Sequence, residues 1–259
     1  MIKFEKHVSK GSKFNQIYIP KNIENLIEVG DKVEVKLIEK HTKLNYSKDL
    51  KKLSEFKENL IKNIFSFLSN SNIKQIFIVG SFLTEKINYN DIDIVLISEK
   101  TNNKLEHSIY EKLIEKFNLK FHLLVIEEKQ LINLLKICPL TKSMFNTFIS
   151  NKKLNIPIER IIDKNHIKFL LMMPYDLLEI RLSSRNFFNN LRRLITIERF
   201  LKNKNLNTKE INQELKHLLK DILYTRIKNN EEIESNSIKF LREIIKSKLN
   251  TIENLIKNG

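Results

Sequence analysis

The stretch Ile78-Val79-Gly80-Ser81, separated by nine residues from Asp91-Ile92-Asp93-Ile94, decides how this chain of 259 residues is interpreted. The apolar run that ends at Val79 predicts a short buried strand, and Gly80-Ser81 predicts a turn directly after it. Backbone N–H groups at such a turn can bind a phosphate, and the Ser81 hydroxyl adds another donor.

The second half of this stretch predicts a strand with two carboxylates on one face. Asp91 and Asp93 share that face because alternate residues of a strand point the same way, whereas Ile92 and Ile94 point into the core. Paired carboxylates suit Mg²⁺ or Mn²⁺, and together with a phosphate-binding turn they suit metal-dependent phosphoryl or nucleotidyl transfer. An ordinary strand and turn followed by two solvent-exposed acids is the alternative.

The flanking sequence predicts an α+β fold with a mixed sheet. Apolar runs at 92–97 and 121–126 predict two further strands, and the helical periodicity of 105–117 predicts a crossover helix between them. Residues 41–70 form a Lys-rich amphipathic stretch whose apolar positions recur at helical spacing. A helix around 130–136 and a strand or turn near 148–154 complete this region. The apolar positions of the stretch at 41–70 are Leu50, Leu53, Phe56, Leu60, Ile64, Phe67 and Leu68.

The glycine, serine and paired aspartates in this order resemble the motif of polymerase-β-like nucleotidyltransferases of the minimal type, over about residues 55–155. The resemblance implies that Asp91 and Asp93 are catalytic and bind Mg²⁺ or Mn²⁺. It also implies that Gly80 and Ser81 bind the phosphates of a nucleoside triphosphate. Thr84 and Lys86, which follow Ser81, are further candidates for contacts with the nucleotide.

The chain departs from that superfamily at one position. Its members usually carry a third carboxylate on the strand after the crossover helix, but residues 120–126 contain no acid. His122 is the nearest polar residue, and it is either a catalytic general base or a buried neutral histidine. Glu127 and Glu128 follow the strand. An active enzyme and an inactive nucleotide sensor both remain open.

The first 42 residues predict a small β module. Ile17-Tyr18-Ile19 ends at Pro20, and Val33, Val35 and Leu37 alternate with charged residues after the turn Gly30-Asp31. This pattern resembles SpoVT/AbrB swapped-hairpin domains, which implies a homodimer and DNA binding. About 40 residues cannot bury a sufficient core alone. The alternative is a module that only dimerises, since residues 1–40 carry a net charge of only +2 and no arginine precedes position 160.

Residues 161–259 predict a helical domain. Pro174 is predicted to open a helix that reaches Leu201, and further helices are predicted over 208–226 and from 235 onward. Four arginines, spaced by 4, 7 and 7 residues, would follow one stripe of the first helix. They are candidates for nucleic-acid binding, or they are flanking arginines paired with acids. These residues are Arg181, Arg185, Arg192 and Arg199.

Composition limits the classes of protein that need to be considered. A hydrophobic content of 41% excludes an intrinsically disordered chain. The single cysteine, Cys138, excludes an intrachain disulfide and favours a reducing compartment. Without a run of 18 apolar residues or an N-terminal signal sequence, we expect a cytoplasmic protein that does not enter a membrane. The net charge of +15 fits nucleic-acid binding, or the Lys, Asn and Ile usage of an AT-rich genome.

Together these patterns predict three domains: a swapped-hairpin module over 1–42, a nucleotidyltransferase domain over 43–160 and a helical substrate-binding domain over 161–259. The leading hypothesis is Mg²⁺-dependent transfer of a nucleoside monophosphate to a hydroxyl of tRNA, another RNA 3′ end, a protein or a small molecule, as in toxin–antitoxin systems. The competing hypothesis is a DNA-binding, antitoxin-like regulator with a degenerate transferase domain.

Overall fold

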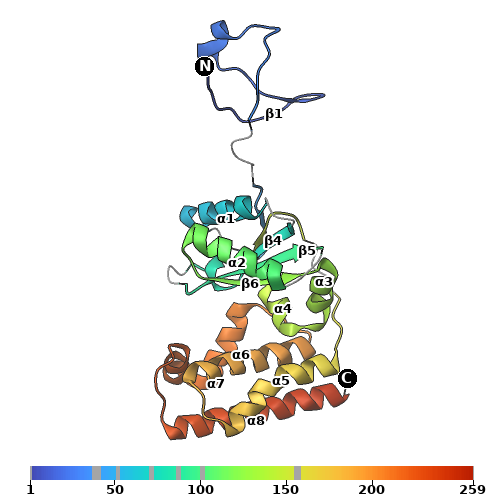
Figure 1. Cartoon of the computed structure of the whole chain (residues 1–259). Helices are drawn as coiled ribbons and strands as arrows, with labels where there is room; N and C mark the ends of the chain where they lie inside the picture. Colours follow the sequence, from blue (N-terminus) through green and yellow to red (C-terminus); the bar gives the residue numbers. More distant parts are fainter. Residues whose placement is uncertain are drawn as a thin grey trace. The chain divides into compact units, whose positions relative to one another are not determined.

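The computed structural model describes residues 2–36, 42–50, 53–69, 73–85, 89–99, 103–154 and 159–258. They form two compact units, Met1–Lys40 and His41–Gly259. The predicted α+β class is confirmed: a small two-stranded sheet lies in the first unit, and a mixed five-stranded sheet and C-terminal helices form the second (Figure 1).

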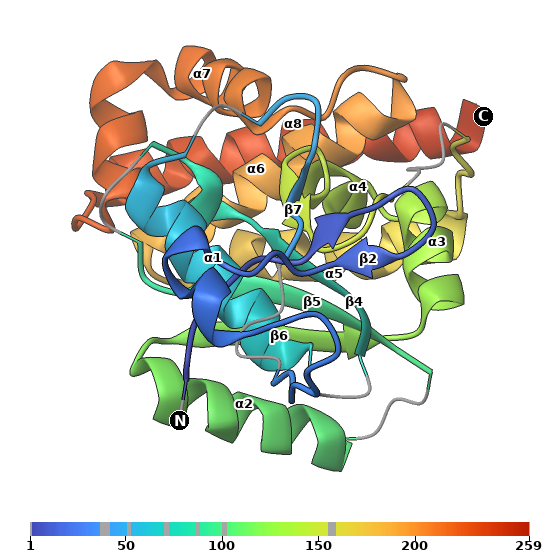
Figure 2. The ribbon, with the colours of Figure 1, turned by 90° about the horizontal axis from the view of Figure 1, so that it is seen from above.

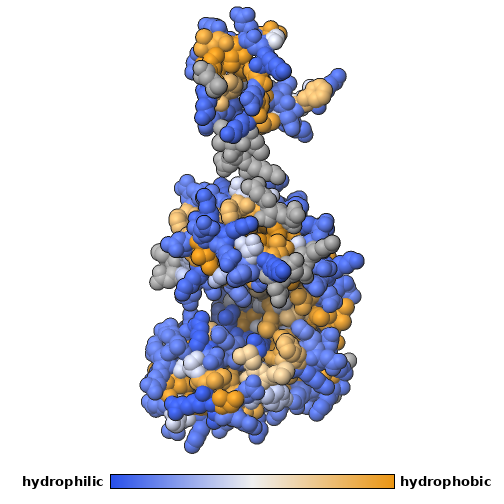
Figure 3. Space-filling model, viewed as in Figure 1, coloured by the Kyte–Doolittle hydropathy of each residue, from blue (hydrophilic) through white to orange (hydrophobic). Residues whose placement is uncertain are grey.

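The first unit contains the hairpin β1 (Ser9–Lys10) and β2 (Asn15–Gln16) and the 3₁₀-helix η1 (Lys21–Leu26). None of its described residues is buried, and apolar side chains lie on its surface (Figure 3). The strand predicted at 33–37 is absent from the described residues 31–36, and Leu37 lies outside them. A strand needs a hydrogen-bonding partner, and residues 2–36 of a single copy supply none for this segment.

Five strands of the second unit form one sheet in the order β3-β7-β4-β5-β6. Figure 2 labels the last four of these strands. Strands β4 and β5 are antiparallel, whereas β5 and β6 are parallel and joined by α2 (Asn103–Phe117). The strands and helix predicted between 76 and 126 are therefore confirmed. The strands are β3 (Asn45–Tyr46), β4 (Ile73–Val79), β5 (Ile92–Ser98), β6 (Phe121–Ile126) and β7 (Phe148–Ser150).

Helices cover both faces of this sheet. Helices α1 (Glu55–Leu68) and α2 pack with Ile92 and Ile94 in one core. Helices α3 (Glu128–Ile137) and α4 (Pro139–Met144) cover the opposite face, where Val95 and Ile97 lie in a second core. Alternation along β5 therefore places Asp93 on the face covered by α3 and α4.

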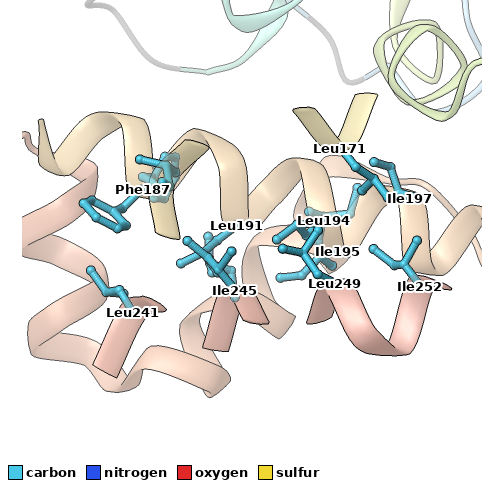
Figure 4. Packing of buried hydrophobic residues seen from close by; sticks show 14 of the residues in the cluster. Leu171, Phe187, Leu191, Leu194, Ile195, Ile197, Leu241, Ile245, Leu249 and Ile252 are labelled. Carbon is cyan, nitrogen blue, oxygen red and sulfur yellow. The ribbon is translucent and has the colours of Figure 1, made fainter. Parts of the chain in front are cut away.

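Four helices build the C-terminal part around one apolar core (Figure 4). They are α5 (Lys164–Glu179), α6 (Ser184–Leu201), α7 (Thr208–Lys228) and α8 (Ser235–Asn258). The continuous helix predicted from Pro174 to Leu201 is wrong. The side chain of Asp163 accepts hydrogen bonds from the amides of Asn165 and His166, so α5 begins at Lys164. Pro174 therefore lies inside this helix instead of at its start. Arg242 on α8 donates to the backbone carbonyls of Leu177 and Glu179 at the end of α5.

An ion network joins α6, α7 and α8. Glu198, with a side chain 10% exposed, accepts hydrogen bonds from Lys202 and, at 2.6 Å, from Lys248. Lys248 also lies 3.5 Å from Glu214. Burial by itself raises the pKa of Glu198, but the two lysines outweigh it and hold that pKa below its ordinary value. Glu198 is therefore ionised at neutral pH. Its contact with Lys248, which also approaches Glu214, links the three helices.

The two domains predicted over 43–160 and 161–259 lie within a single compact unit. The hydroxyl of Ser143 on α4 donates to the carbonyl of Leu206, just before α7, at 2.8 Å. Cys138 contributes to the core of the helical part. Among the described residues, no helix has the length and apolar character needed to cross a membrane.

Candidate functional site

Gly80 occupies a conformation that only glycine adopts readily. It follows β4 directly, with φ +78° and ψ −154°. A Cβ atom at this position would lie 2.0 Å from Oδ2 of Asp93. The glycine therefore lets the turn and the carboxylate of the neighbouring strand approach closely, which brings together two of the residues predicted for the site.

The sheet register places three strands side by side at this point. Val79 on β4 pairs with Asp93 on β5, which pairs with His122 on β6. Nδ1 of His122 lies 3.1 Å from Oδ1 of Asp93. The His122 side chain is 76% exposed, so the alternative of a buried histidine is wrong. Parallel pairing of β5 and β6 thus gives Asp93 a hydrogen-bond partner that is exposed to solvent.

The surroundings of Asp93 disfavour the ionised form of its carboxyl group, so its pKa lies above the ordinary value. Its side chain is 27% exposed, and burial raises its pKa, opposed by the hydrogen bond from His122 and assisted by the charge of Asp91. Asp91 lies just before β5 and is half-buried. A cation between two nearby carboxylates, one of them partly desolvated, would stabilise the ionised form of both.

The donor set fits a divalent cation that keeps open positions. Among the described residues no group of three or more His, Cys, Asp and Glu could hold a metal ion. Carboxylate oxygens such as those of Asp91 and Asp93 suit a hard divalent cation, which can complete its coordination with water or phosphate.

The turn after Gly80 is closed by its own backbone. Leu83 N donates to Gly80 O at 3.3 Å, and both Thr84 N and its hydroxyl donate to Ser81 O, the hydroxyl at 2.8 Å. Ser81 is exposed and can meet a ligand. The Thr84 hydroxyl donates its proton within the turn, so a contact with nucleotide would use its oxygen as an acceptor. Lys86, also predicted to bind nucleotide, lies outside the described residues.

Lys57 is a residue of this region that the sequence pattern did not identify. It is only 6% exposed, and its Nζ donates to the carbonyls of Phe82 and Thr84, both at 2.8 Å. The available signal was its spacing: it lies four residues after Leu53 and four before Ile61, on the buried stripe of α1. A lysine on the apolar face of a helix is rare unless it has a partner.

The prediction that four arginines lie on one helix is only partly correct: Arg185, Arg192 and Arg199 lie on α6. Arg181 lies in the connection between α5 and α6 rather than on either helix. Arg185 is exposed and donates to the carbonyl of Lys228, and Arg192 lies over the Phe188 ring, where burial lowers its pKa.

Arg199 is engaged within the helical part. It donates to Glu210, to Glu214 at 3.1 Å and to the carbonyl of Asn205. Its side chain is only 11% exposed. Arg181 and Arg185 are therefore the two of the four predicted arginines that lie on the surface.

One comparison with known proteins bears on this site. A family model described as a nucleotidyltransferase domain matches residues 58–147. The match spans β4, the turn at Gly80, both aspartates and His122. It supports the nucleotidyltransferase superfamily for this part of the chain, and a transferase that moves a nucleoside monophosphate as its general activity. No curated protein matches the chain in a sequence search.

Proposed function

We propose that the chain is a divalent-cation-dependent nucleotidyltransferase that moves a nucleoside monophosphate from a nucleoside triphosphate to an acceptor hydroxyl. The observation that carries the proposal is the approach of Gly80 to Asp93, with Asp91 before it and His122 beside it. The closeness of this turn, the two carboxylates and the imidazole at neighbouring strand ends supports phosphate binding, cation binding and proton transfer at one site. The match over residues 58–147 supports the same chemistry.

Each residue has a role in this reaction. Ser81 and the backbone of the turn bind the phosphates, and Asp91 and Asp93 hold the cation, which neutralises phosphate charge when bound. An acceptor oxygen forms a bond to the α-phosphorus, the bond to the β-phosphate oxygen breaks, and pyrophosphate leaves.

His122 accepts the proton of the attacking hydroxyl in this proposal. The reaction uses the tautomer in which Nδ1, 3.1 Å from Oδ1 of Asp93, donates to that carboxylate and Nε2 accepts the proton. His122 thus occupies the strand next to the aspartates where the superfamily usually carries its third carboxylate.

We propose RNA, and tRNA in particular, as the acceptor, with a role of the toxin–antitoxin kind. Residues 161–259 carry 19 basic and 12 acidic residues. Arg181, just before α6, and Arg185, in the first turn of α6, are both exposed. Exposed arginines bind phosphates through paired N–H groups. A protein or small-molecule acceptor would not need this excess of basic charge.

We propose that residues 1–42 mediate a homodimer. The described residues of this unit bury no side chain, and Phe14, Tyr18 and Leu26 are each more than 60% exposed. Interleaving with a second copy would cover these side chains and give the segment at 33–37 a strand to pair with. A net charge of +2 gives little support for DNA binding by the same surface.

A transfer assay tests the proposal. The full chain is incubated with Mg²⁺ or Mn²⁺, each labelled nucleoside triphosphate, and total RNA or total protein. We expect label on RNA with the wild type and with Glu115→Ala, an exposed acid on α2, but not with Asp91→Ala or Asp93→Ala. Bound nucleotide without transfer would instead indicate a nucleotide sensor. A shift of promoter DNA that is lost without residues 1–42 would support the DNA-binding regulator.

A further inference from the structure

Lys57 is a buried cation that the proposed mechanism does not use. It lies on α1, on the opposite face of the sheet from Asp93, and is only 6% exposed. Burial lowers the pKa of its ammonium group. Lysine is almost never buried without partners that compensate for lost hydration, so its contacts indicate what it does.

Nζ of Lys57 contacts the segment between Ser81 and Asp91 at two places. At one end of the segment, Nζ donates to the carbonyls of Phe82 and Thr84 at 2.8 Å. It also lies 5.1 Å from the centre of the Phe82 ring. At the other end it lies 5.6 Å from the centre of the Tyr89 ring, two residues before Asp91. The two rings pack edge to face, with centres 4.8 Å apart.

One ammonium group therefore contacts this segment near both of its ends, at Phe82 and Thr84 and at Tyr89. Hydrogen bonds from a charged donor are stronger than neutral ones, and a desolvated cation over an aromatic ring adds further attraction. Direct binding of phosphate by Lys57 does not fit this geometry, because the group is buried and two of its three N–H donors point at carbonyls.

We propose that Lys57 is a positioning residue of the nucleotide site. It fixes residues 81–85 and Tyr89, so that the turn at Gly80 and the carboxylate of Asp91 keep the spacing that the proposed nucleotide site requires. The inference rests on the proposed function, because it assigns to that site the side chain that sets its shape. It predicts that loss of the ammonium loosens this segment and weakens nucleotide binding without removing any group that touches the nucleotide.

The test compares Lys57→Met with Lys62→Met in the full chain. Methionine keeps an unbranched apolar side chain without a donor, and Lys62 is an exposed lysine on the same helix. Binding of ATP, GTP, CTP and UTP, each with Mg²⁺, is measured by calorimetry, and amide hydrogen exchange is measured over 81–91. We expect Lys57→Met to weaken binding of the preferred nucleotide at least tenfold. We also expect faster exchange over 81–91, with α6 and α8 unchanged, and wild-type behaviour from Lys62→Met.

Wild-type affinity and exchange in Lys57→Met would overturn the inference. If that variant does not fold, Tyr89→Leu replaces it, because this change removes one ring contact and leaves both hydrogen bonds. We then expect about threefold weaker binding and faster exchange at 89–91, and no change in either would also overturn the inference. If the wild type binds none of the four nucleotides, the proposed function fails, and exchange over 81–91 in Lys57→Met alone decides whether Lys57 holds the segment.

Discussion

Replacement of Gly80 by alanine should disable the site while leaving the fold intact. The new Cβ would lie 2.0 Å from Oδ2 of Asp93, and real Cβ contacts essentially never fall under 3.0 Å, so the two groups must separate further. A shift of about 1 Å in a reacting group can lower the rate about 100-fold. The backbone at φ +78° and ψ −154° adds strain of about 1–3 kcal/mol. At this chain length that cost lowers Tm by roughly 2–12 °C.

A double-mutant cycle separates the carboxylate contact from the backbone strain. Thermal unfolding and label transfer are measured for Gly80→Ala, Asp93→Ala and the double variant. We expect Gly80→Ala to cost about 1 kcal/mol less stability when Asp93 is already alanine, because the contact is then absent. Gly30→Ala is the matched control, since Gly30 also has a positive φ, +110°, but a Cβ atom added there would meet nothing within 4 Å.

Two results would refute this reasoning. One is a folded Gly80→Ala variant whose transfer rate stays within threefold of the wild type. The other is an equal stability cost of Gly80→Ala with and without the Asp93 carboxylate. Either would mean that the close approach of turn and carboxylate is incidental to the activity.

Other variants test the remaining electrostatic and assembly features. Burial and the neighbouring carboxylate raise the pKa of Asp93, so the folded chain binds that proton more tightly than the unfolded chain and stability falls as pH rises through the raised pKa. Asp93→Asn should therefore abolish transfer yet raise Tm at pH 7 in thermal melts. His122→Ala and His122→Asn should both lower the transfer rate, by about 10²–10⁴-fold; recovery with asparagine, which keeps a donor to Asp93, would contradict the role of general base. Lys248→Met removes a hydrogen bond from the nearly buried Glu198 and should cost about 3 kcal/mol in denaturant unfolding. Deletion of residues 1–42 should convert a dimer to a monomer in light scattering, and an unchanged mass would exclude that interface.

Much of the central fold follows from local sequence pattern. The runs at 92–97 and 121–126 contain only residues that suit buried strands, apart from Asp93 and His122. The C-terminal helices were harder to delimit, because α5 begins at a cap on Asp163 and ends where Arg242 reaches it from another helix. A contact from 63 residues away leaves no trace in a local pattern.

The site was predictable only in part. The spacing of Gly80, Asp91 and Asp93 predicts a turn after one strand and two carboxylates on the next. The register of β5 and β6 places His122 beside Asp93. On the preceding helix, Ile64 and Leu68 are buried as their spacing predicts. Phe56 is the exception, because it is 67% exposed and its neighbour Lys57 is buried instead. Apolar character alone assigns the wrong face here, because the lysine is stabilised by carbonyls 25 and 27 residues later in the chain.

The first unit buries none of its described side chains. If a second copy covers them, the amount of folded protein depends on the concentration of chains. Under the proposed dimer, assembly is second order, so a culture that makes half as many chains assembles them at about a quarter of the rate. Newly made chains that wait for a partner keep Phe14 and its apolar neighbours in water, where proteases and chaperones act on exposed segments. The level of synthesis, rather than a separate ligand, would then set how many chains survive in assembled form.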